Sequence, residues 1–247
     1  MALNDTSIQI NQMIKERVAL VTGASRGIGR ALAQGLASEG FKVAIVARSD
    51  EELKKLAAEV DRVSESLVCS IDISDDRLVK DAVASILRKW GRVDVLVNNA
   101  GIFELGSLDV AASSLDRLYQ INLKAPFCFM QEVLPVMRKQ KSGYIFNIAS
   151  VSGIEGYAGY GAYASSKFAL VGLNEAIFKE ISKEGIKITA ICPSWVDTAM
   201  AQEANLPMTG DLMIQPGDIM KTVLWLMSLS SSACVSKVVI NCASTVT

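Results

Sequence analysis

A tyrosine and a lysine four residues apart are the pair whose spacing most clearly allows chemistry. Tyr163 and Lys167 lie in the stretch Tyr-Ala-Ser-Ser-Lys, and on a helix they would share one face. A phenol can donate its proton to a carbonyl that is being reduced, but its ordinary pKa of about 10 is poorly matched to neutral pH. A cation one turn away would stabilise the phenolate and lower that pKa. The spacing therefore predicts a general acid and base, although many helices carry such a pair by chance.

The composition narrows the classes of protein to which this pair could belong. The chain has 247 residues, of which 50% are hydrophobic and 21% charged, with a formal net charge of −1. No basic run is long enough to follow a nucleic acid, and no apolar run is long enough to span a membrane. Histidine is absent, so we expect no histidine-based triad and no metal site. The five scattered cysteines lack a CxxC pair, which predicts reduced thiols in a cytoplasmic protein.

Apolar runs that alternate with helical patterns predict the fold that must position the tyrosine and the lysine. Seven runs are interpreted as strands: residues 17–22, 41–47, 67–71, 93–97, 143–149, 186–191 and 235–241. Such alternation is typical of a doubly wound α/β fold with a parallel sheet, which binds ligands at the carboxyl ends of its strands. We expect residues 1–14 to be a flexible arm and residues 15–247 to form one domain. Residues 199–215 show no clear periodicity and are interpreted as a lid. Ser49-Asp50-Glu51-Glu52 is interpreted as the capping box of the helix after the second strand, and Ser74 as the cap of the helix after the third.

A glycine-rich turn after the first strand predicts a site for an anionic cofactor. Gly23, Gly27 and Gly29 follow the strand directly, and a helical pattern begins at Arg30. Free N–H groups at a helix N-terminus bind phosphate, and the missing side chains allow it to approach closely. The alternative is a plain tight turn, but the order strand, turn and helix favours a dinucleotide.

The residues after the second strand favour NADP(H) over NAD(H). An acid at this point would bond the ribose 2′-hydroxyl of NAD, but here Ala47 is followed by Arg48. An arginine can pair with the 2′-phosphate of NADP, and Arg26 in the glycine turn is a second candidate. Asp50 is close enough in the sequence to compete for Arg48. The alternative for either arginine is simple solvation.

Polar residues also occur at the ends of later strands and inside one helix. Asp72 follows the third strand and could accept a hydrogen bond from an adenine amino group, while Asn98 and Asn99 follow the fourth. Asn122 falls within a helix predicted from about residue 114, and Pro126 lies four residues further on. Because proline has no N–H to donate to the Asn122 carbonyl, we expect a local kink that frees polar groups for water.

Together these motifs resemble those of the short-chain dehydrogenase/reductase family. The resemblance extends from about residue 17 to residue 241, and the motifs stand in the family's order: Thr22-Gly23-x-x-x-Gly27-x-Gly29, Asn98-Asn99-Ala100-Gly101, Ser150 and Tyr163-x-x-x-Lys167. It implies a single-domain Rossmann fold with strand order 3-2-1-4-5-6-7, commonly assembled as a homotetramer.

The resemblance also implies roles for four residues. Tyr163 would be the general acid and base, and Lys167 would lower its pKa and bind the nicotinamide ribose. Ser150 would steady the substrate oxygen, and Asn122 would hold a water in a proton relay. The implied cofactor contacts are Thr22, Gly23, Ser25, Arg26, Gly27, Ile28, Gly29, Arg48, Ser49, Asp72, Ile73, Asn99, Ala100, Gly101, Tyr163, Lys167, Pro193, Ser194, Val196 and Thr198.

Two positions depart from the family's pattern. The family usually has Pro-Gly after the sixth strand, where this chain has Pro193-Ser194. In the family the last strand is usually followed by an Asp-Gly-Gly-like sequence, whereas here the corresponding residues are Asn241-Cys242-Ala243-Ser244. The first departure affects backbone freedom near the nicotinamide, and the second affects a tail that often helps to form the oligomer.

The sequence therefore favours an NADPH-dependent oxidoreductase that reduces a small-molecule ketone or aldehyde and forms a homo-oligomer, a tetramer or a dimer. The nearest subgroup is the 3-oxoacyl-(acyl-carrier-protein) reductases, so a 3-oxoacyl thioester is one candidate substrate. The basic residues at 138–141 could receive an acidic carrier protein, or could only complement a helix dipole. Candidates for an apolar substrate pocket are Phe103, Tyr157, Tyr160, Trp195 and Met200. The competing functions are a non-catalytic NADP-binding sensor or scaffold, and an alcohol dehydrogenase working in the oxidative direction.

Overall fold

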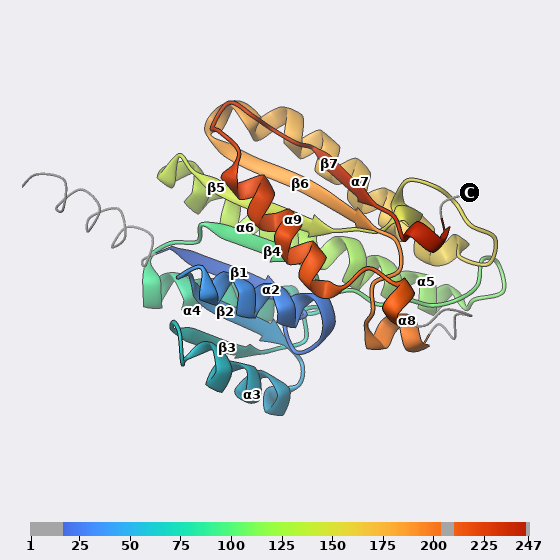
Figure 1. The fold of residues 1–247 in the computed structure, drawn as a ribbon, viewed down its shortest axis with the longest axis horizontal. Coiled ribbons are helices and arrows are strands. Elements are labelled where there is room, and N and C mark those ends of the chain that lie inside the picture. Colours follow the sequence, from blue (N-terminus) through green and yellow to red (C-terminus); the bar gives the residue numbers. More distant parts are fainter. Residues whose placement is uncertain (1–16, 204–209, 246–247) are drawn as a thin grey trace, which may run out of the picture.

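The fold is built on one sheet of seven parallel strands (Figure 1). The computed structural model describes residues 17–203 and 210–245, so the predicted arm and part of the predicted lid lie outside the described residues. The strands are β1 (Val18–Thr22), β2 (Lys42–Ala47), β3 (Ser66–Ser70), β4 (Val95–Asn98), β5 (Gly143–Ile148), β6 (Ile186–Pro193) and β7 (Lys237–Ile240). Their order is β3-β2-β1-β4-β5-β6-β7, which confirms the predicted fold class and strand order.

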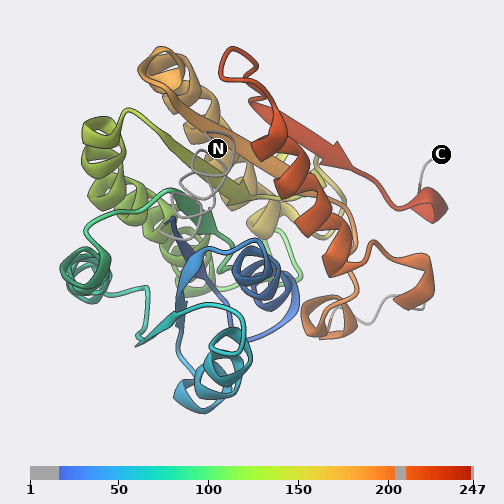
Figure 2. The ribbon, with the colours of Figure 1, turned by 60° about the vertical axis from the view of Figure 1, so that its left-hand side comes forward.

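Helices pack on both faces of this sheet (Figures 1 and 2). One face is covered by α2 (Gly27–Ser38), α3 (Asp50–Val60) and α9 (Pro216–Ser228). The other is covered by α4 (Asp76–Trp90), α6 (Ala125–Gln140) and α7 (Gly161–Ile181). Because both faces are buried, the strands read as almost continuous apolar runs. No helix within the described residues is long and apolar enough to cross a membrane.

The carboxyl ends of the strands meet at one edge of the sheet, on the right in Figure 1. Two short helices, α5 (Ala112–Tyr119) and α8 (Ala199–Glu203), lie at this edge. The chain order reverses between β1 and β4, and the loops that diverge from these two strands leave a crevice between them. The fold therefore brings the glycine turn and the motifs of the later strands to the same edge.

Helix starts agree with the sequence in one case and differ in another. Ser49 caps α3 as predicted, because its Oγ accepts the Glu52 N–H at 3.4 Å. For α4 the cap is Asp75, whose carboxylate accepts the Arg77 N–H at 2.9 Å, and not Ser74. The N–H of Ser74 instead donates to Asp72 at 2.9 Å. A strand-end turn therefore precedes the helix and moves its start by one residue.

The helix predicted from about residue 114 is interrupted where Asn122 lies. A π-helical turn over Gln120–Lys124 separates α5 from α6, and the Ala125 N–H bonds the Gln120 carbonyl. Pro126 cannot donate a hydrogen bond to the Asn122 carbonyl, which explains why the α-helical pattern fails here. The α-helix is therefore interrupted where the sequence predicts a disturbance, by a π-helical turn, a form that is frequent at functional sites.

Candidate active site

A large cavity opens at the carboxyl edge of the sheet. Its volume is about 1500 Å³, which exceeds the roughly 300–1,000 Å³ of a pocket for one small ligand. It therefore has room for a dinucleotide and a second molecule. Nearly all the residues predicted to touch cofactor or substrate line this cavity; Thr22, Gly29 and Asn122 do not. No cluster of acidic or cysteine side chains in the described part of the chain could hold a metal ion.

Thr22 and Gly29 do not line the cavity but support the glycine turn from behind, so cofactor contacts by these two residues stay a prediction. The Thr22 hydroxyl accepts the N–H groups of Asn99 and Ala100, each at 3.0 Å. The Asn99 amide donates to the carbonyls of Thr22 and Gly23 at 3.0 and 3.2 Å. A Cβ on Gly29 would collide with the Gly23 carbonyl oxygen. These contacts fix the end of β1 against the end of β4.

The turn itself fits the pyrophosphate of a dinucleotide. Gly23 and Gly27 have φ angles of 64° and 55°, which favour glycine. The residue that precedes α2, Arg26, makes no side-chain capping bond to the first N–H groups of the helix. A Cβ on Gly27 would lie 3.0 Å from the Thr198 methyl group. Because glycine has no side chain, this turn and the loop after β6 can lie close together without a clash.

The end of β2 carries the residues expected to choose between NADP and NAD. Ala47, Arg48 and Ser49 all line the cavity. The sequence suggested that Asp50 could compete for Arg48. In the structure the Asp50 carboxylate pairs instead with Lys54 at 2.7 Å. Glu52 also lines this region, and sequence reasoning identified it only as part of the cap of α3.

Asp72 lies at the end of the cavity where the sequence predicts adenine. Hydrogen bonds from Ser74 hold its pKa below the ordinary value, and the charges of Arg48 and Arg117 add to this effect. Arg117 and Gln120 line the cavity and were not predicted, because their direction depends on how α5 and the π turn pack. The Gln120 amide donates to the Ser74 carbonyl at 2.8 Å.

The tyrosine, lysine and serine of the predicted active site are brought together. Ser150 follows β5, and Tyr163 and Lys167 lie on the first turns of α7. Tyr163 is 9% exposed and hydrogen-bonds with Ser150. Lys167 is 4% exposed, and its Nζ donates to the Ile148 carbonyl at 3.0 Å. The Lys167 Nζ lies 5.8 Å from the centre of the Tyr163 ring.

The expected lowering of the tyrosine pKa by the lysine is not observed. Burial raises the pKa of Tyr163 to about 12, and its hydrogen bond with Ser150 opposes this only in part. Burial also lowers the pKa of Lys167 to about 8. Desolvation is therefore the largest cause of both pKa shifts. At neutral pH the phenol keeps its proton.

Asn122 lies behind the active site and not in its wall. Its side chain is 1% exposed and holds the backbone of Ile102 on both sides, accepting from its N–H at 2.9 Å and donating to its carbonyl at 3.0 Å. It also donates to Ser166 at 3.0 Å, whose hydroxyl donates to the Tyr163 carbonyl at 2.7 Å. Both amide hydrogens are thus used for positioning. A water relay at Asn122 remains a prediction. Because the side chain is already hydrogen-bonded, the main-chain carbonyl of Asn122 would have to hold the water.

The two departures from the family pattern cause no local strain. In the described residues Lys141 is the only non-glycine residue with positive φ, so Ser194 adopts an ordinary backbone conformation. The N–H of Ser194 donates to the Ile240 carbonyl at 2.8 Å. At the C-terminal departure the Cys242 thiol donates to the Trp195 carbonyl at 3.0 Å. The chain after β7 therefore supports the loop after β6.

The low pKa of Lys167 predicts a pH-dependent contribution to stability. The ordinary pKa of lysine is 10.5 and that of buried Lys167 is about 8, so between these values the unfolded chain binds more protons than the folded chain. The free energy of unfolding should therefore rise with pH in this window, by up to roughly 1 kcal/mol per pH unit. Urea denaturation of the wild type and Lys167→Met would isolate this contribution, because other titrating groups are shared. A difference in free energy that stays constant from pH 8 upward would contradict the assignment.

Comparisons with known proteins agree with this geometry. Residues 17–208 match the family model for short chain dehydrogenases. An oxidoreductase of Staphylococcus epidermidis is 31% identical over 229 residues, which cover 92% of this chain and 98% of that protein. The structure of a β-ketoacyl-[ACP] reductase from Bacteroides thetaiotaomicron is similar, with a TM-score of 0.82, 38% identity, and coverage of 92% and 97%. A metagenomic short-chain oxidoreductase in complex with NADP has a TM-score of 0.81, 32% identity, and the same coverage. The chain belongs to the short-chain dehydrogenase/reductase family of oxidoreductases.

Proposed function

We propose that this protein is an NADPH-dependent carbonyl reductase that converts a ketone or aldehyde to an alcohol. The observation that carries the proposal is that buried Tyr163 hydrogen-bonds with Ser150 beside Lys167, in a cavity that the glycine turn and Arg48 also line. When bound, the nicotinamide would supply two electrons and one proton, as hydride, to the carbonyl carbon. A non-catalytic sensor would not need this serine, tyrosine and lysine together.

The chain's own residues orient the carbonyl and supply the second proton. Ser150 and Tyr163 both line the cavity, and the hydroxyl of each can donate to a carbonyl oxygen placed between them. Such polarisation is most effective when the donors are already fixed, as Tyr163 is by burial and Ser150 by its bond from the Ser152 N–H at 3.1 Å. As the carbonyl bond becomes a single bond, the oxygen takes the Tyr163 proton. The positive charge of the Lys167 ammonium group then stabilises the negative charge of the Tyr163 phenolate.

The protonation state of Tyr163 supports reduction over alcohol oxidation. With its pKa raised to about 12 by burial, the phenol is protonated at neutral pH and can donate. Oxidation would need the phenolate as a base, which is scarce at that pH. An alcohol dehydrogenase of the same architecture would require a lower tyrosine pKa.

The preference for NADPH rests on the residues at the end of β2. Ala47 occupies the place where an acid would bond the 2′-hydroxyl of NAD, and Arg48 lines the cavity next to it. The similar metagenomic enzyme is in complex with NADP. Arg26, in the glycine turn, also lines the cavity and is proposed as the second cation of this site.

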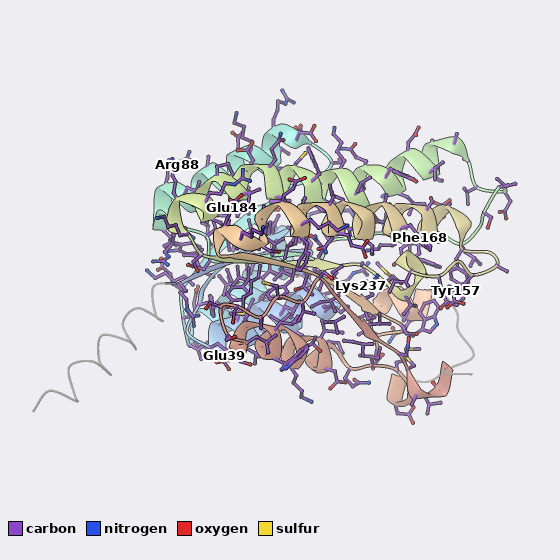
Figure 3. All side chains as sticks on the ribbon, turned by 90° about the horizontal axis from the view of Figure 1, so that it is seen from above. Glu39, Arg88, Tyr157, Phe168, Glu184 and Lys237 are labelled. Carbon is purple, nitrogen blue, oxygen red and sulfur yellow. The ribbon has the colours of Figure 1, made fainter. Side chains whose placement is uncertain are left out.

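We further propose a homo-oligomer in a reducing compartment such as the cytoplasm. Phe127 of α6 and Phe168 of α7 are 44% and 43% exposed, and helices α6 and α7 cover the same face of the sheet (Figure 3). Exposed aromatic side chains of this kind are typical of interfaces. No disulfide joins the five cysteines, all of which lie in the described part of the chain, and disulfides are rare in reducing compartments.

The proposal is tested by supplying NADPH with a panel of ketones and aldehydes. We expect loss of NADPH absorbance to match the alcohol that chromatography detects, and NADH to be used more slowly. Tight binding of NADPH with no alcohol from any carbonyl would favour the sensor. Faster formation of a ketone from an alcohol at neutral pH would favour the dehydrogenase.

A further inference from the structure

We propose that the substrate of this reductase is an uncharged ketone that carries a ring, which packs against the cluster formed by Trp195, Phe103 and Tyr160, and not an acyl thioester on an acidic carrier. The inference rests on the proposed function, because it concerns the second molecule in the same cavity. Two independent observations carry it: the aromatic side chains around Tyr163 and the charge of the surrounding loops.

Aromatic rings from three separate loops meet beside the tyrosine. Phe103 follows β4, Tyr160 precedes α7, and Trp195 follows β6. The Phe103 ring centre lies 5.1 Å from that of Tyr163 at 74°, 5.6 Å from that of Tyr160 and 6.5 Å from that of Trp195. Tyr160 and Trp195 are 6.2 Å apart at 63°. All four residues line the cavity, so a planar or cyclic group next to the reacting carbonyl would meet ring faces and edges.

The cations that line the cavity lie mainly with the residues expected to bind the cofactor. Apart from Lys167 beside Tyr163, they are Arg26, Arg48 and Arg117, which line the cavity with the residues expected to bind the phosphates and adenine. The sequence has no lysine or arginine between Arg92 and Arg117, between Lys141 and Lys167, or between Lys187 and Lys221. These three intervals contain the loops that carry Phe103, Tyr160 and Trp195.

The same loops carry carboxylates. The acidic residues that they contribute within the described chain are Glu104, Asp109, Glu155, Asp197 and Asp211. Glu155 lines the cavity itself and accepts a hydrogen bond from the hydroxyl of Tyr157 at 3.2 Å. A carrier protein, the phosphates of a coenzyme A thioester, or a carboxylate substrate would therefore approach like charges. An uncharged ketone would not.

The basic cluster at residues 138–141 cannot offset this charge, because it lies at the opposite edge of the sheet. It ends α6 just before β5 begins, and Arg138 pairs with Glu184 at 2.7 Å. Figure 3 shows Glu184 far from Tyr157, which stands at the cavity end of the molecule. Within the described residues, the loops that carry the aromatic rings therefore offer no lysine or arginine to an acidic carrier protein.

Matched substrates separate ring, charge and thioester. The first pair is acetophenone and 2-octanone, which have the same number of carbons. The second pair is methyl 4-acetylbenzoate and 4-acetylbenzoate, which differ by one charge, and acetoacetyl-coenzyme A is the thioester. At low ionic strength we expect kcat/KM to be higher by about tenfold or more for acetophenone than for 2-octanone, and for methyl 4-acetylbenzoate than for 4-acetylbenzoate. Acetoacetyl-coenzyme A should be the poorest substrate.

Variants assign these preferences to the residues. Trp195→Leu should lower kcat/KM for acetophenone by about tenfold and leave that for 2-octanone nearly unchanged, whereas Trp195→Phe, which keeps a ring, should restore most of the loss. Glu155→Gln should raise kcat/KM for 4-acetylbenzoate by about threefold without affecting its methyl ester. Calorimetry of methyl 4-acetylbenzoate with protein and NADP⁺ should show weaker binding for Trp195→Leu.

The outcomes distinguish this inference from the proposed function. Equal or faster reduction of acetoacetyl-coenzyme A, 2-octanone or 4-acetylbenzoate would overturn the inference and leave a carbonyl reductase. No reduction of any ketone would overturn the proposed function, and the calorimetric comparison would still show whether the Trp195 site binds a ring. Equal binding of methyl 4-acetylbenzoate by the wild type and Trp195→Leu would overturn the ring site itself.

Discussion

Tyr163→Phe should lower kcat for ketone reduction by at least about 10²-fold, because removal of a general acid costs between 10² and 10⁴ in rate. The variant keeps the ring that packs 5.1 Å from Phe103 and loses only the hydroxyl that bonds with Ser150. It should therefore fold normally and bind NADPH almost as tightly as the wild type. Steady-state kinetics and a titration of NADPH fluorescence measure the two quantities separately.

Tyr160→Phe is the matched control for this variant. Tyr160 lies in the same cavity and contacts the same phenylalanine, but only its ring has a role in the proposed site. Its loss of a hydroxyl should leave kcat close to that of the wild type. If Tyr163→Phe kept more than a tenth of the activity, or if both variants lost activity equally, the assignment of the proton donor would be wrong.

Arg48→Ala should weaken the binding of NADPH by about 10- to 100-fold, the range expected when a charged hydrogen-bond partner worth about 1.5–3 kcal/mol is removed. NADH has no 2′-phosphate, so its dissociation constant should hardly change. The preference for NADPH over NADH should then shrink by the same factor. Fluorescence titration of both cofactors measures this directly.

Arg88→Ala provides the control for charge alone. Arg88 is near the end of α4, and Figure 3 shows it at the opposite end of the molecule from Tyr157. This variant changes the net charge by the same amount but should leave both dissociation constants unaltered. An equal loss of NADPH and NADH binding in Arg48→Ala would indicate that this arginine does not read the 2′-phosphate.

The fold could be predicted largely because its signals are local and repeated. Buried parallel strands appear as apolar runs, and their separation by helices restricts the topology. The break near Asn122 was also predictable, because Pro126 removes one specific hydrogen bond. The start of α4 was predicted one residue early, since Ser74 and Asp75 are both good caps and a turn at Asp72 decides between them.

The site was predicted less completely, because its details depend on packing between distant segments. Thr22 and Gly29 belong to the expected motif, but their contacts show that they support the glycine turn from behind. The pKa of Tyr163 depends on burial, and its spacing from Lys167 carries no information about desolvation. Arg117 faces the cavity only because of how α5 packs. Motif spacing predicts which residues meet, but not what surrounds them.

The most direct test of the account follows a deuterium label. NADPH carrying two deuterium atoms at the reactive carbon of its nicotinamide is incubated with methyl 4-acetylbenzoate and the wild-type protein, and the product is analysed by mass spectrometry. We predict an alcohol with one deuterium on the carbinol carbon, formed in equal amount to the NADPH consumed, and almost none with Tyr163→Phe. An alcohol without the label, or NADPH consumed without any alcohol, would contradict the assignment of carbonyl reduction to this cavity.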